Sequence, residues 1–377
     1  MSLIDVPQEL VDNIVTMVGD FRSLKACSLA ARIFRHRSQR ILLQSMTLSA
    51  SPRGPRVQNF SAARTFLEDS PHVAQCVLHL KLFLRHPGDF GDLQEVLGRL
   101  ANVVSCSIEG WRPFKWNHLP PGLSKAILSF LSGQSVQRLY MECIISLPGI
   151  IVIHSAASLS FYDVQIAQHT EEPLPLDSPV LHSLILRGRC GSIYSYLTGQ
   201  ALGVHLSGLR RLSINPQHTP TETISLITAV AGNLEHIHFA CSGLRLEADF
   251  LALPALPTLR SVSGFTHYTS QWISGLAETI ISILTSGSSP YLKEVLLTFP
   301  SLPELPIAPA LALDAAICTH PANPSIRWRM KVPGAEGIPL AFADDLRWCL
   351  PSAQARGRVS LEKYVDESKY GWPFCRL

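Results

Sequence analysis

His236 and His238 stand two residues apart in a short segment of alternating character, so both imidazoles would project from one face of a strand. Two imidazoles on one side can contribute to a zinc site, which in proteins usually has four ligands. The sequence offers no third ligand at a recognisable spacing. We therefore expect these histidines to be structural or to contact a partner, and we predict no metal and no cofactor.

A catalytic site would need a nucleophile, a base and a group that stabilises developing charge. The sequence contains no Gly-x-Ser-x-Gly, no phosphate-binding glycine loop ending in Lys-Ser/Thr, no His-Glu-x-x-His and no Cys-x-x-Cys. Asp344 and Asp345 are adjacent in a helix-like segment, where neighbouring side chains point apart, and we interpret them as charges near a helix N-terminus. We predict a protein that is not an enzyme, with no catalytic residues.

The composition predicts a folded protein with more than one domain or a repeat array. The chain has 377 residues, of which 46% are hydrophobic and 16% charged. Nine scattered cysteines indicate reduced thiols. Met1 to Asp20 carries four acidic residues and no Lys or Arg, and the longest apolar run, Ile144 to Ile153, is too short to cross a bilayer. We expect a soluble protein of the cytoplasm and/or nucleus that does not enter a membrane.

A short motif, apolar-x-x-apolar-x-apolar, recurs from His72 onward and is called the strand motif below. Its copies start 20 to 33 residues apart. They are Val77/Leu80/Leu82, Val103/Cys106/Ile108, Val136/Leu139/Met141, Ala156/Leu159/Phe161, Leu181/Leu184/Leu186, Leu209/Leu212/Ile214, Leu234/Ile237/Phe239, Leu292/Val295/Leu297 and the weaker Leu259/Val262/Gly264. Ile326/Trp328/Met330 and Val359/Leu361 alternate in the same way without the full motif. The motif resembles the start of a leucine-rich repeat.

Helix-length apolar patterns lie between several copies of the motif, at Leu93 to Leu100, Leu123 to Leu131, Ile224 to Val230 and Trp272 to Leu284. Thr219-Pro220-Thr221-Glu222 has the spacing of a capping box, which predicts a helix that opens there. The order strand, helix, strand favours parallel strands with helices on the outside. We predict an α/β fold in which residues 72–377 form an irregular leucine-rich-repeat-like solenoid.

The residues between the apolar positions of each motif should face the open, concave side of such an array. Arg and Tyr are the side chains most often found as anchors in protein interfaces. The preferred substrate-binding residues are therefore the outward-facing Arg138, Tyr140, Tyr162, Arg187 and Arg211. The alternative is that each is an ordinary solvated residue of a strand.

The first forty-five residues predict a small helical module. Asp5 can cap a helix whose first turn contains Pro7. Leu10, Val11, Ile14, Val15 and Val18 then recur at helical spacing, and Gly19 can end the helix. Leu24, Cys27 and Ala31, followed by Phe34, Ile41 and Leu42, indicate two further short helices over the first. We predict a helical module at 4–45 and a linker with a connecting helix at 46–71.

The module resembles the F-box family, whose pattern is a Leu-Pro-x-Glu-Leu start, spaced Ile and Leu, a short acidic turn, Leu-(x2)-Cys/Val and an Arg-x-Trp-like end. Here the sequence is Val6-Pro7-Gln8-Glu9-Leu10, then Ile14, Val18, Asp20, Leu24, Cys27, Ser28 and Arg32-Ile33-Phe34. Val6 and Phe34 stand where the family usually has Leu and Trp. The resemblance covers about 40 residues, and a helical cap that covers the end of a repeat array is the alternative interpretation.

The resemblance implies a partner and a role. The module would bind the Skp-type adaptor of a cullin-RING (SCF-type) E3 ubiquitin ligase, and the repeat-like domain would hold a protein substrate that the sequence does not name. The adaptor-binding residues carried over by position are Pro7, Leu10, Ile14, Val18, Leu24, Cys27 and Phe34. A leucine-rich-repeat scaffold with no ligase role is the second hypothesis.

A third hypothesis comes from charge. Phe21 to Leu67 contains nine Lys or Arg and no acidic residue, and a basic surface can bind nucleic acid with an affinity that falls steeply with salt. However, the formal net charge of the whole chain is only +3, and the basic residues are not interleaved with stacking aromatic residues. We therefore expect a solvated basic face or an acidic protein partner rather than nucleic acid.

Overall fold

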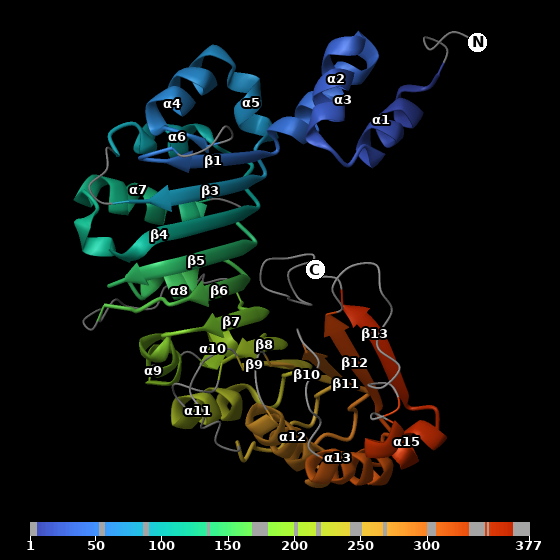
Figure 1. Cartoon of the computed structure of the whole chain (residues 1–377). Coiled ribbons are helices and arrows are strands. Elements are labelled where there is room, and N and C mark those ends of the chain that lie inside the picture. The colour runs from blue at the N-terminus through green and yellow to red at the C-terminus, as the bar shows by residue number, and fades with distance from the viewer. Residues whose placement is uncertain are drawn as a thin grey trace. The chain divides into compact units, whose positions relative to one another are not determined.

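The computed structural model describes residues 6–52, 57–85, 90–133, 136–167, 180–199, 203–215, 220–241, 251–266, 270–299, 307–331, 344 and 347–364. The chain divides into two compact units, Met1–Pro179 and Val180–Leu377. Both are α/β units in which parallel strands alternate with helices (Figure 1).

The first unit begins with three helices, α1 (Gln8–Met17), α2 (Phe21–Ala30) and α3 (Arg32–Leu43), as predicted. Pro7 is the N-cap residue of α1 rather than part of its first turn, and the predicted cap Asp5 lies outside the described residues. Asp20 caps α2, since its side chain accepts a hydrogen bond of 2.8 Å from the backbone N–H of Ser23. Hydrogen bonds from the side chain and then from the backbone of Ser23 lower the pKa of Asp20.

Six parallel strands follow in the first unit, in the spatial order β2-β1-β3-β4-β5-β6. Their bounds are β1 (Ser45–Ser49), β2 (Val57–Gln58), β3 (His79–Leu84), β4 (Ser105–Lys115), β5 (Arg138–Ile145) and β6 (Ser158–Tyr162). The helices are α4 (Phe60–Asp69), α5 (Pro71–Cys76), α6 (Leu93–Arg99), α7 (Pro121–Gly133) and α8 (Ile150–His154), with a 3-10 turn at Trp116–His118. Helices α6, α7 and α8 lie behind the strands in Figure 1.

The prediction that 46–71 is a linker with a connecting helix is wrong in one respect. The connecting helix is present as α4, but β1 and β2 already belong to the sheet. Met46 and Leu48 are buried because β1 pairs in parallel with β3. The sheet therefore starts at Ser45, about one repeat earlier than the first strand motif indicates.

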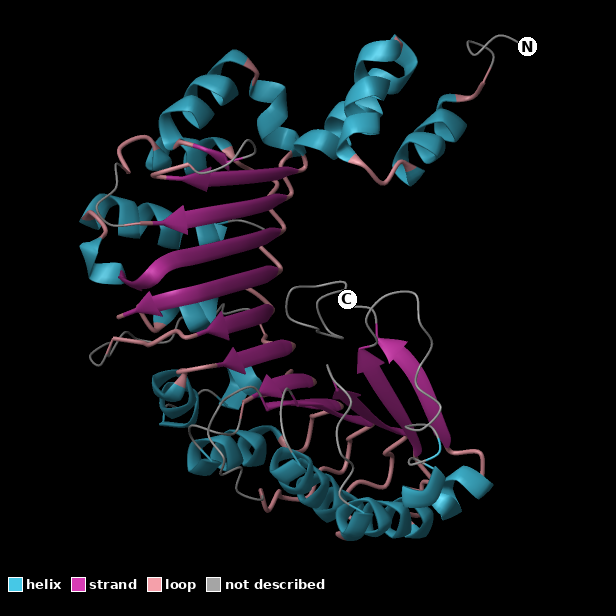
Figure 2. Cartoon of the chain, in the orientation of Figure 1, coloured by secondary structure: helices cyan, strands magenta, loops and turns pink. Residues whose placement is uncertain are grey.

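The second unit contains seven parallel strands in the order β7-β8-β9-β10-β11-β12-β13. They are β7 (Ser183–Arg187), β8 (Arg211–Ile214), β9 (His236–Cys241), β10 (Ser261–Thr266), β11 (Glu294–Phe299), β12 (Ser325–Lys331) and β13 (Val359–Tyr364). The helices are α9 (Gly191–Gly199), α10 (Gly203–Leu206), α11 (Pro220–Val230), α12 (Ser270–Thr285), α13 (Ile307–Thr319) and α15 (Pro351–Ala355). Helices α11, α12 and α13 run along one side of these strands (Figure 2).

The strand motif predicts the strands correctly. All nine copies and both tail segments coincide with strands β3 to β13. The burial of β3, β5 and β6 alternates as expected, with Leu80, Leu139 and Leu159 buried between partly exposed neighbours. The four predicted helix patterns coincide with α6, α7, α11 and α12, and α11 begins at Pro220, although Thr219 lies outside the described residues. The predicted single region 72–377, however, falls into both units.

The weak ninth copy of the motif has a structural reason. Gly264 occupies the third apolar position on β10, where every other copy has a side chain. A Cβ added at Gly264 would lie 2.5 Å from Cδ2 of Leu276. Leu276 on α12 is itself buried. The leucine from the helix therefore fills the volume that the strand leaves empty.

Candidate protein-binding surfaces

The core of the N-terminal module consists of Val11, Val15 and Leu24, each at most 6% exposed. Six partly buried side chains pack against them, namely Val6, Val18, Ile33, Phe34, Ile41 and Leu42. Three helices of this length give only a thin core, so the stability of the module is small by itself. The core uses only one side of α1.

The opposite side of α1 is an unusual surface. Leu10, Ile14 and Met17 are 53%, 60% and 86% exposed, and their spacing places them on one face of the helix. We call these three residues the apolar face. Helix α2 adds Phe21 and Leu29, which are 42% and 73% exposed. Exposed large apolar side chains that gather in a short stretch are typical of binding surfaces, which makes these residues a candidate site.

The seven predicted adaptor-binding residues take different places in this module. Pro7, Leu10 and Ile14 are exposed, Val18, Cys27 and Phe34 are half-buried, and Leu24 is buried. Leu24, Val18 and Phe34 belong to the core of the module, so their part in any interface is to support the helices rather than to offer free surface.

Sequence reasoning missed Met17, Phe21 and Leu29. The sequence predicted one apolar stripe along α1, whereas in the structure its apolar residues form two. Val11, Val15 and Val18 follow one face, while Leu10, Ile14 and Met17 follow another about 100° away. Separating the two sets of three- and four-residue spacings would have indicated a second apolar face that the small module has no room to cover.

Basic side chains lie close by in sequence. Arg22 and Lys25 on α2 and Arg32, Arg35 and Arg40 on α3 are exposed. Arg64, in contrast, is engaged within the first unit, where its guanidinium lies 2.9 Å from Oδ1 of Asp92. Among its described residues, the exposed charges of the predicted basic stretch therefore lie on α2 and α3.

The open face of the first unit carries a regular grid of side chains, because the parallel register aligns corresponding positions. Its three rows are Ser45, His79, Ser105, Arg138 and Ser158; Thr47, Lys81, Ser107, Tyr140 and Ser160; and Ser49, Phe83, Glu109, Glu142 and Tyr162. Adjacent members of a row stand on neighbouring strands, about 4.8 Å apart. Side chains that are far apart in sequence thus form one surface.

Three predicted substrate-binding residues, Arg138, Tyr140 and Tyr162, belong to this grid. Arg138 is exposed, and Tyr140 and Tyr162 are partly buried. The hydroxyl of Tyr140 donates a 2.6 Å hydrogen bond to Oε2 of Glu142, and Tyr162 is the register partner of Glu142. The structure therefore brings the three together, with Glu142 between the two tyrosines.

The two other predicted residues, Arg187 and Arg211, lie on β7 and β8 of the second unit and are partly buried. The corresponding face of this unit differs from the expected open surface. Ile185, His238 and Leu296 were predicted to face solvent there, yet they are 9%, 3% and 6% exposed. This face is consequently less accessible than that of the first unit.

His236 and His238 do face the same way, and each meets a serine. Nδ1 of His236 lies 2.7 Å from Oγ of Ser261, and Nδ1 of His238 lies 2.7 Å from Oγ of Ser263. The Ser263 hydroxyl donates its proton to the carbonyl of Ile237, so the His238 imidazole is the donor in its own pair. Burial, and then the charge of Arg187, lowers the pKa of His238 to about 3. His238 is thus neutral, and because its Nδ1 is the donor in this pair, that nitrogen cannot take a proton from the Ser263 hydroxyl.

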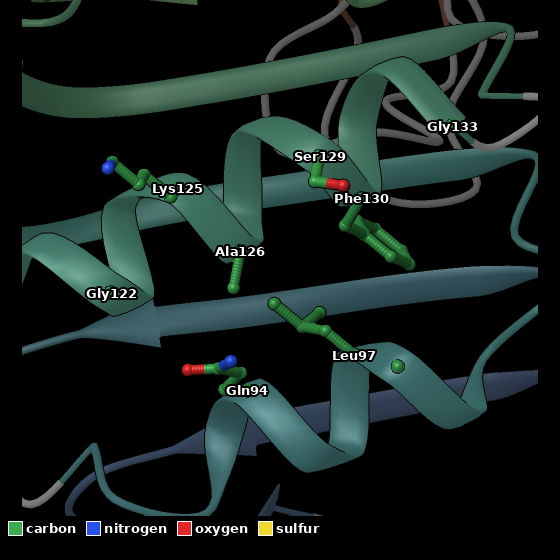
Figure 3. Close-up of a pocket in the computed structure, with 9 residues that line it drawn as sticks. Gln94, Leu97, Gly122, Lys125, Ala126, Ser129, Phe130 and Gly133 are labelled. Atoms are coloured by element: carbon green, nitrogen blue, oxygen red, sulfur yellow. The ribbon is translucent and has the colours of Figure 1, made fainter.

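A groove of about 680 Å³ separates α6 and α7 on the helical side of the first unit (Figure 3). Leu97 from α6 and Phe130 from α7 extend into the space between the helices. Gly98 and Gly133 keep it open, since a Cβ at either position would meet nothing within 4 Å. Lys125 is the charged side chain among the lining residues, so the groove has no acid–base pair for catalysis.

No protein-family model matches this chain, and no curated protein is similar to it at a significant level. Within the parts of the chain that the structure describes, no three His, Cys, Asp or Glu side chains are grouped to hold a metal ion. Over the same residues, no helix has both the length and the apolar character needed to span a membrane.

Proposed function

We propose that this chain is the substrate-recognition adaptor of an SCF-type E3 ubiquitin ligase, in which α1–α3 bind a Skp-type adaptor and the repeat-like strands hold a protein substrate. The apolar face of Leu10, Ile14 and Met17 is the observation that carries the proposal. It coincides in part with the residues that the F-box resemblance assigns to adaptor binding. Such a role places the protein in the cytoplasm or nucleus.

The energetics favour a partner over α1. Burying one exposed leucine- or methionine-sized side chain contributes about 1.5–3 kcal/mol, so the apolar face and the two exposed residues of α2 supply the apolar centre of an interface. The exposed Arg and Lys residues of α2 and α3 are suited to the polar rim of the same interface. An apolar centre beside a basic rim fits an acidic protein partner better than nucleic acid, whose phosphates are bound chiefly by charged and polar groups and whose bases are bound by stacking or edge contacts.

The open face of the first unit supports the receptor half of the proposal. Arg138, Tyr140 and Tyr162 lie together there on a rigid parallel sheet. Tyr and Arg offer large contact areas and directional hydrogen bonds. Arg187 and Arg211 are the corresponding candidates in the second unit.

The proposed mechanism is proximity. A substrate held on the strands and a ligase bound through α1–α3 share one chain, so the substrate has a high effective concentration beside the ligase-bound conjugating enzyme. We propose that no chemical step takes place on this chain.

The test is co-expression of the full chain with a Skp-type adaptor, followed by affinity purification. Wild-type chain should retain the adaptor, and Leu10→Asp and Ile14→Asp should each remove it, because a carboxylate on the apolar face cannot be desolvated cheaply. Leu311→Asp is the matched control, since Leu311 is an exposed apolar residue of α13, 44% exposed. Adaptor binding that is absent, or indifferent to the α1 substitutions, would leave an interaction scaffold without a ligase role.

A further inference from the structure

Two glutamates face each other on the open face of the first unit. Glu109 on β4 and Glu142 on β5 are register partners. Like charges directly opposite on neighbouring strands destabilise a sheet. Such a pair therefore requires neighbouring groups that offset its charge.

The neighbours of the pair satisfy only half of its oxygens. Oε1 of Glu109 lies 2.6 Å from Nζ of Lys81 and accepts a hydrogen bond from Ser107. Oε2 of Glu142 accepts the hydrogen bond from Tyr140. Oε2 of Glu109 and Oε1 of Glu142 have no hydrogen bond or ion pair with any described residue. Lys81 thus pairs with Glu109, and Glu142 has no ion pair among the described residues.

Both glutamates line a pocket of about 340 Å³, whose walls also include residues of β1, β2 and β3. We call it the carboxylate pocket. Its other walls include the aromatic rings of Phe83 and Trp111. The size lies at the lower end of the roughly 300–1,000 Å³ of known ligand sites, which suits one side chain better than a large ligand.

An irregularity of β4 builds the aromatic wall. Between the register pairs Glu109/Glu142 and Phe114/Ile144, β4 has residues 110–113 where β5 has only Cys143. Gly110 is required there, because a Cβ would collide with the carbonyl oxygen of Cys143. The excursion carries Trp111 out of the sheet, where it is 57% exposed. Bulges commonly redirect a side chain next to a binding site.

The aromatic ring of Trp111 already contacts a cationic side chain of the same chain. The guanidinium carbon of Arg85 lies 4.0 Å from the centre of a Trp111 ring, within the range of a cation–π contact. Arg85 makes no ion pair with Glu109 or Glu142 among the described residues. The chain's own arginine therefore shows that the aromatic wall accepts a guanidinium, but it forms no ion pair with Glu142, the carboxylate that Lys81 does not reach.

We propose that the carboxylate pocket binds the guanidinium group of an arginine side chain from a protein partner. A guanidinium is planar, keeps its charge and presents several N–H donors in a fixed fork. It can donate to the two free carboxylate oxygens while its flat face lies against an aromatic ring. The proposal deepens the receptor half of the proposed function, since it names the chemistry of the bound segment, and it does not depend on adaptor binding.

Other occupants fit less well. Calcium needs six to eight oxygen ligands and magnesium six, and the pair supplies two free carboxylate oxygens. The phosphate of a phosphorylated segment could form an ion pair with Arg85, but the carboxylates of Glu109 and Glu142 would repel it. The charge of the walls thus favours a cation, and the flat aromatic surface favours guanidinium over ammonium.

The experiment measures the binding of short peptides to the full-length chain by ligand-observed saturation-transfer NMR. The probe is acetyl-Gly-Ser-Arg-Ser-Gly-amide. The same peptide with citrulline has the shape of arginine without its charge, and versions with lysine and with phosphoserine test ammonium and anion binding. We expect saturation of the arginine methylene protons, about tenfold weaker binding of the citrulline peptide, and no binding of the phosphoserine peptide.

Variants assign the binding to the pocket. Glu142→Gln keeps an acceptor for Tyr140 but removes the charge, and should weaken the arginine peptide about tenfold. Trp111→Ala should weaken it too, and Arg85→Ala should not. Glu95→Gln on α6 and Trp348→Ala in the second unit are the matched controls, since both residues are exposed, and neither should change binding. Circular dichroism melting curves check that each variant is folded.

Three results would overturn the proposal: no saturation of the arginine peptide at about 1 mM, equal binding of the arginine and citrulline peptides, or binding that Glu142→Gln and Trp111→Ala leave unchanged. Binding of the phosphoserine peptide that is lost in Arg85→Ala would instead assign the pocket to anions. If the peptides do not bind as expected, the adaptor-binding proposal still stands. If the adaptor is not retained, the arginine-binding proposal still stands, so the two experiments test the two proposals independently.

Discussion

Leu10 and Val11 are consecutive residues of one helix, yet Leu10 is 53% exposed and Val11 is 1% exposed. The pair marks the boundary between the side of α1 that packs in the core of the module and the side that faces away from it. The same division separates Ile14 from Val15, which are 60% and 1% exposed.

Substitutions on the two sides of α1 should therefore have different effects on stability. Val11→Ala should lower the free energy of unfolding of the module by about 2 kcal/mol, because it leaves a cavity. Leu10→Ala should change it by less than about 0.5 kcal/mol. Native-state hydrogen exchange of the amides of α1–α3 measures both. Equal destabilisation by the two substitutions would contradict the division of α1 into two sides.

The second unit should lose stability in acid through His238. Its pKa is lowered to about 3 by burial, whereas an unfolded histidine has a pKa of about 6.5. The folded state thus holds fewer protons, and the stabilisation that is complete above pH 6.5 is lost as the pH falls from there toward 3. The free energy of unfolding should fall by about 1.4 kcal/mol per pH unit over that window. Urea denaturation at a series of pH values should show a shallower slope for His238→Gln, whereas replacement of the exposed His36 should have no such effect.

Asp314 ties two helices of the second unit together. This buried carboxylate on α13 accepts hydrogen bonds of 3.1 and 2.7 Å from the backbone N–H groups of Ser352 and Ala353, in the first turn of α15. Asp314→Ala should cost about 2 kcal/mol, because charge-assisted bonds are lost and two donors lose their acceptor. Asp314→Asn, which keeps an acceptor, should cost less. Urea denaturation compares them, with the exposed Asp69→Ala as the control.

Gly264 and Leu276 should be energetically coupled. Gly264→Val places a branched side chain where Leu276 lies and should destabilise the second unit by about 1–3 kcal/mol. Leu276→Ala should cost about 2–5 kcal/mol on its own, since it opens a cavity. The double variant should cost less than the sum of the two, because each change compensates the other. Additive costs in a double-mutant cycle would show that the strand and the helix do not share this space.

Much of the fold could be predicted from the sequence because the strand motif alternates strictly. Leu80 and Leu82, for example, are buried on either side of the half-buried Lys81, and the period of two leaves only one choice of face. Strand β1 was missed although Leu43, Met46 and Leu48 have the full spacing of the motif, because Leu43 also continues the helical pattern of α3, of which it is the last residue.

The candidate site was harder to predict because it depends on register and on packing between distant residues. Nothing in the local sequence indicates that Glu109 faces Glu142, or that the chain between Glu109 and Phe114 leaves the sheet. The burial of His238 likewise depends on the residues around β9, because the apolar alternation of the strand motif alone predicts that His238 faces the open side. The exposure of Met17 follows from the small size of the module, which cannot cover two faces of one helix.

The parallel register also has a consequence for how the chain folds. His238 and its partner Ser263 are 25 residues apart, and the other strand partners are separated by similarly short stretches of chain. Each strand therefore needs only a short loop to close before it gains its neighbour. Contacts of this range favour rapid folding that starts at several places and spreads from one strand to the next.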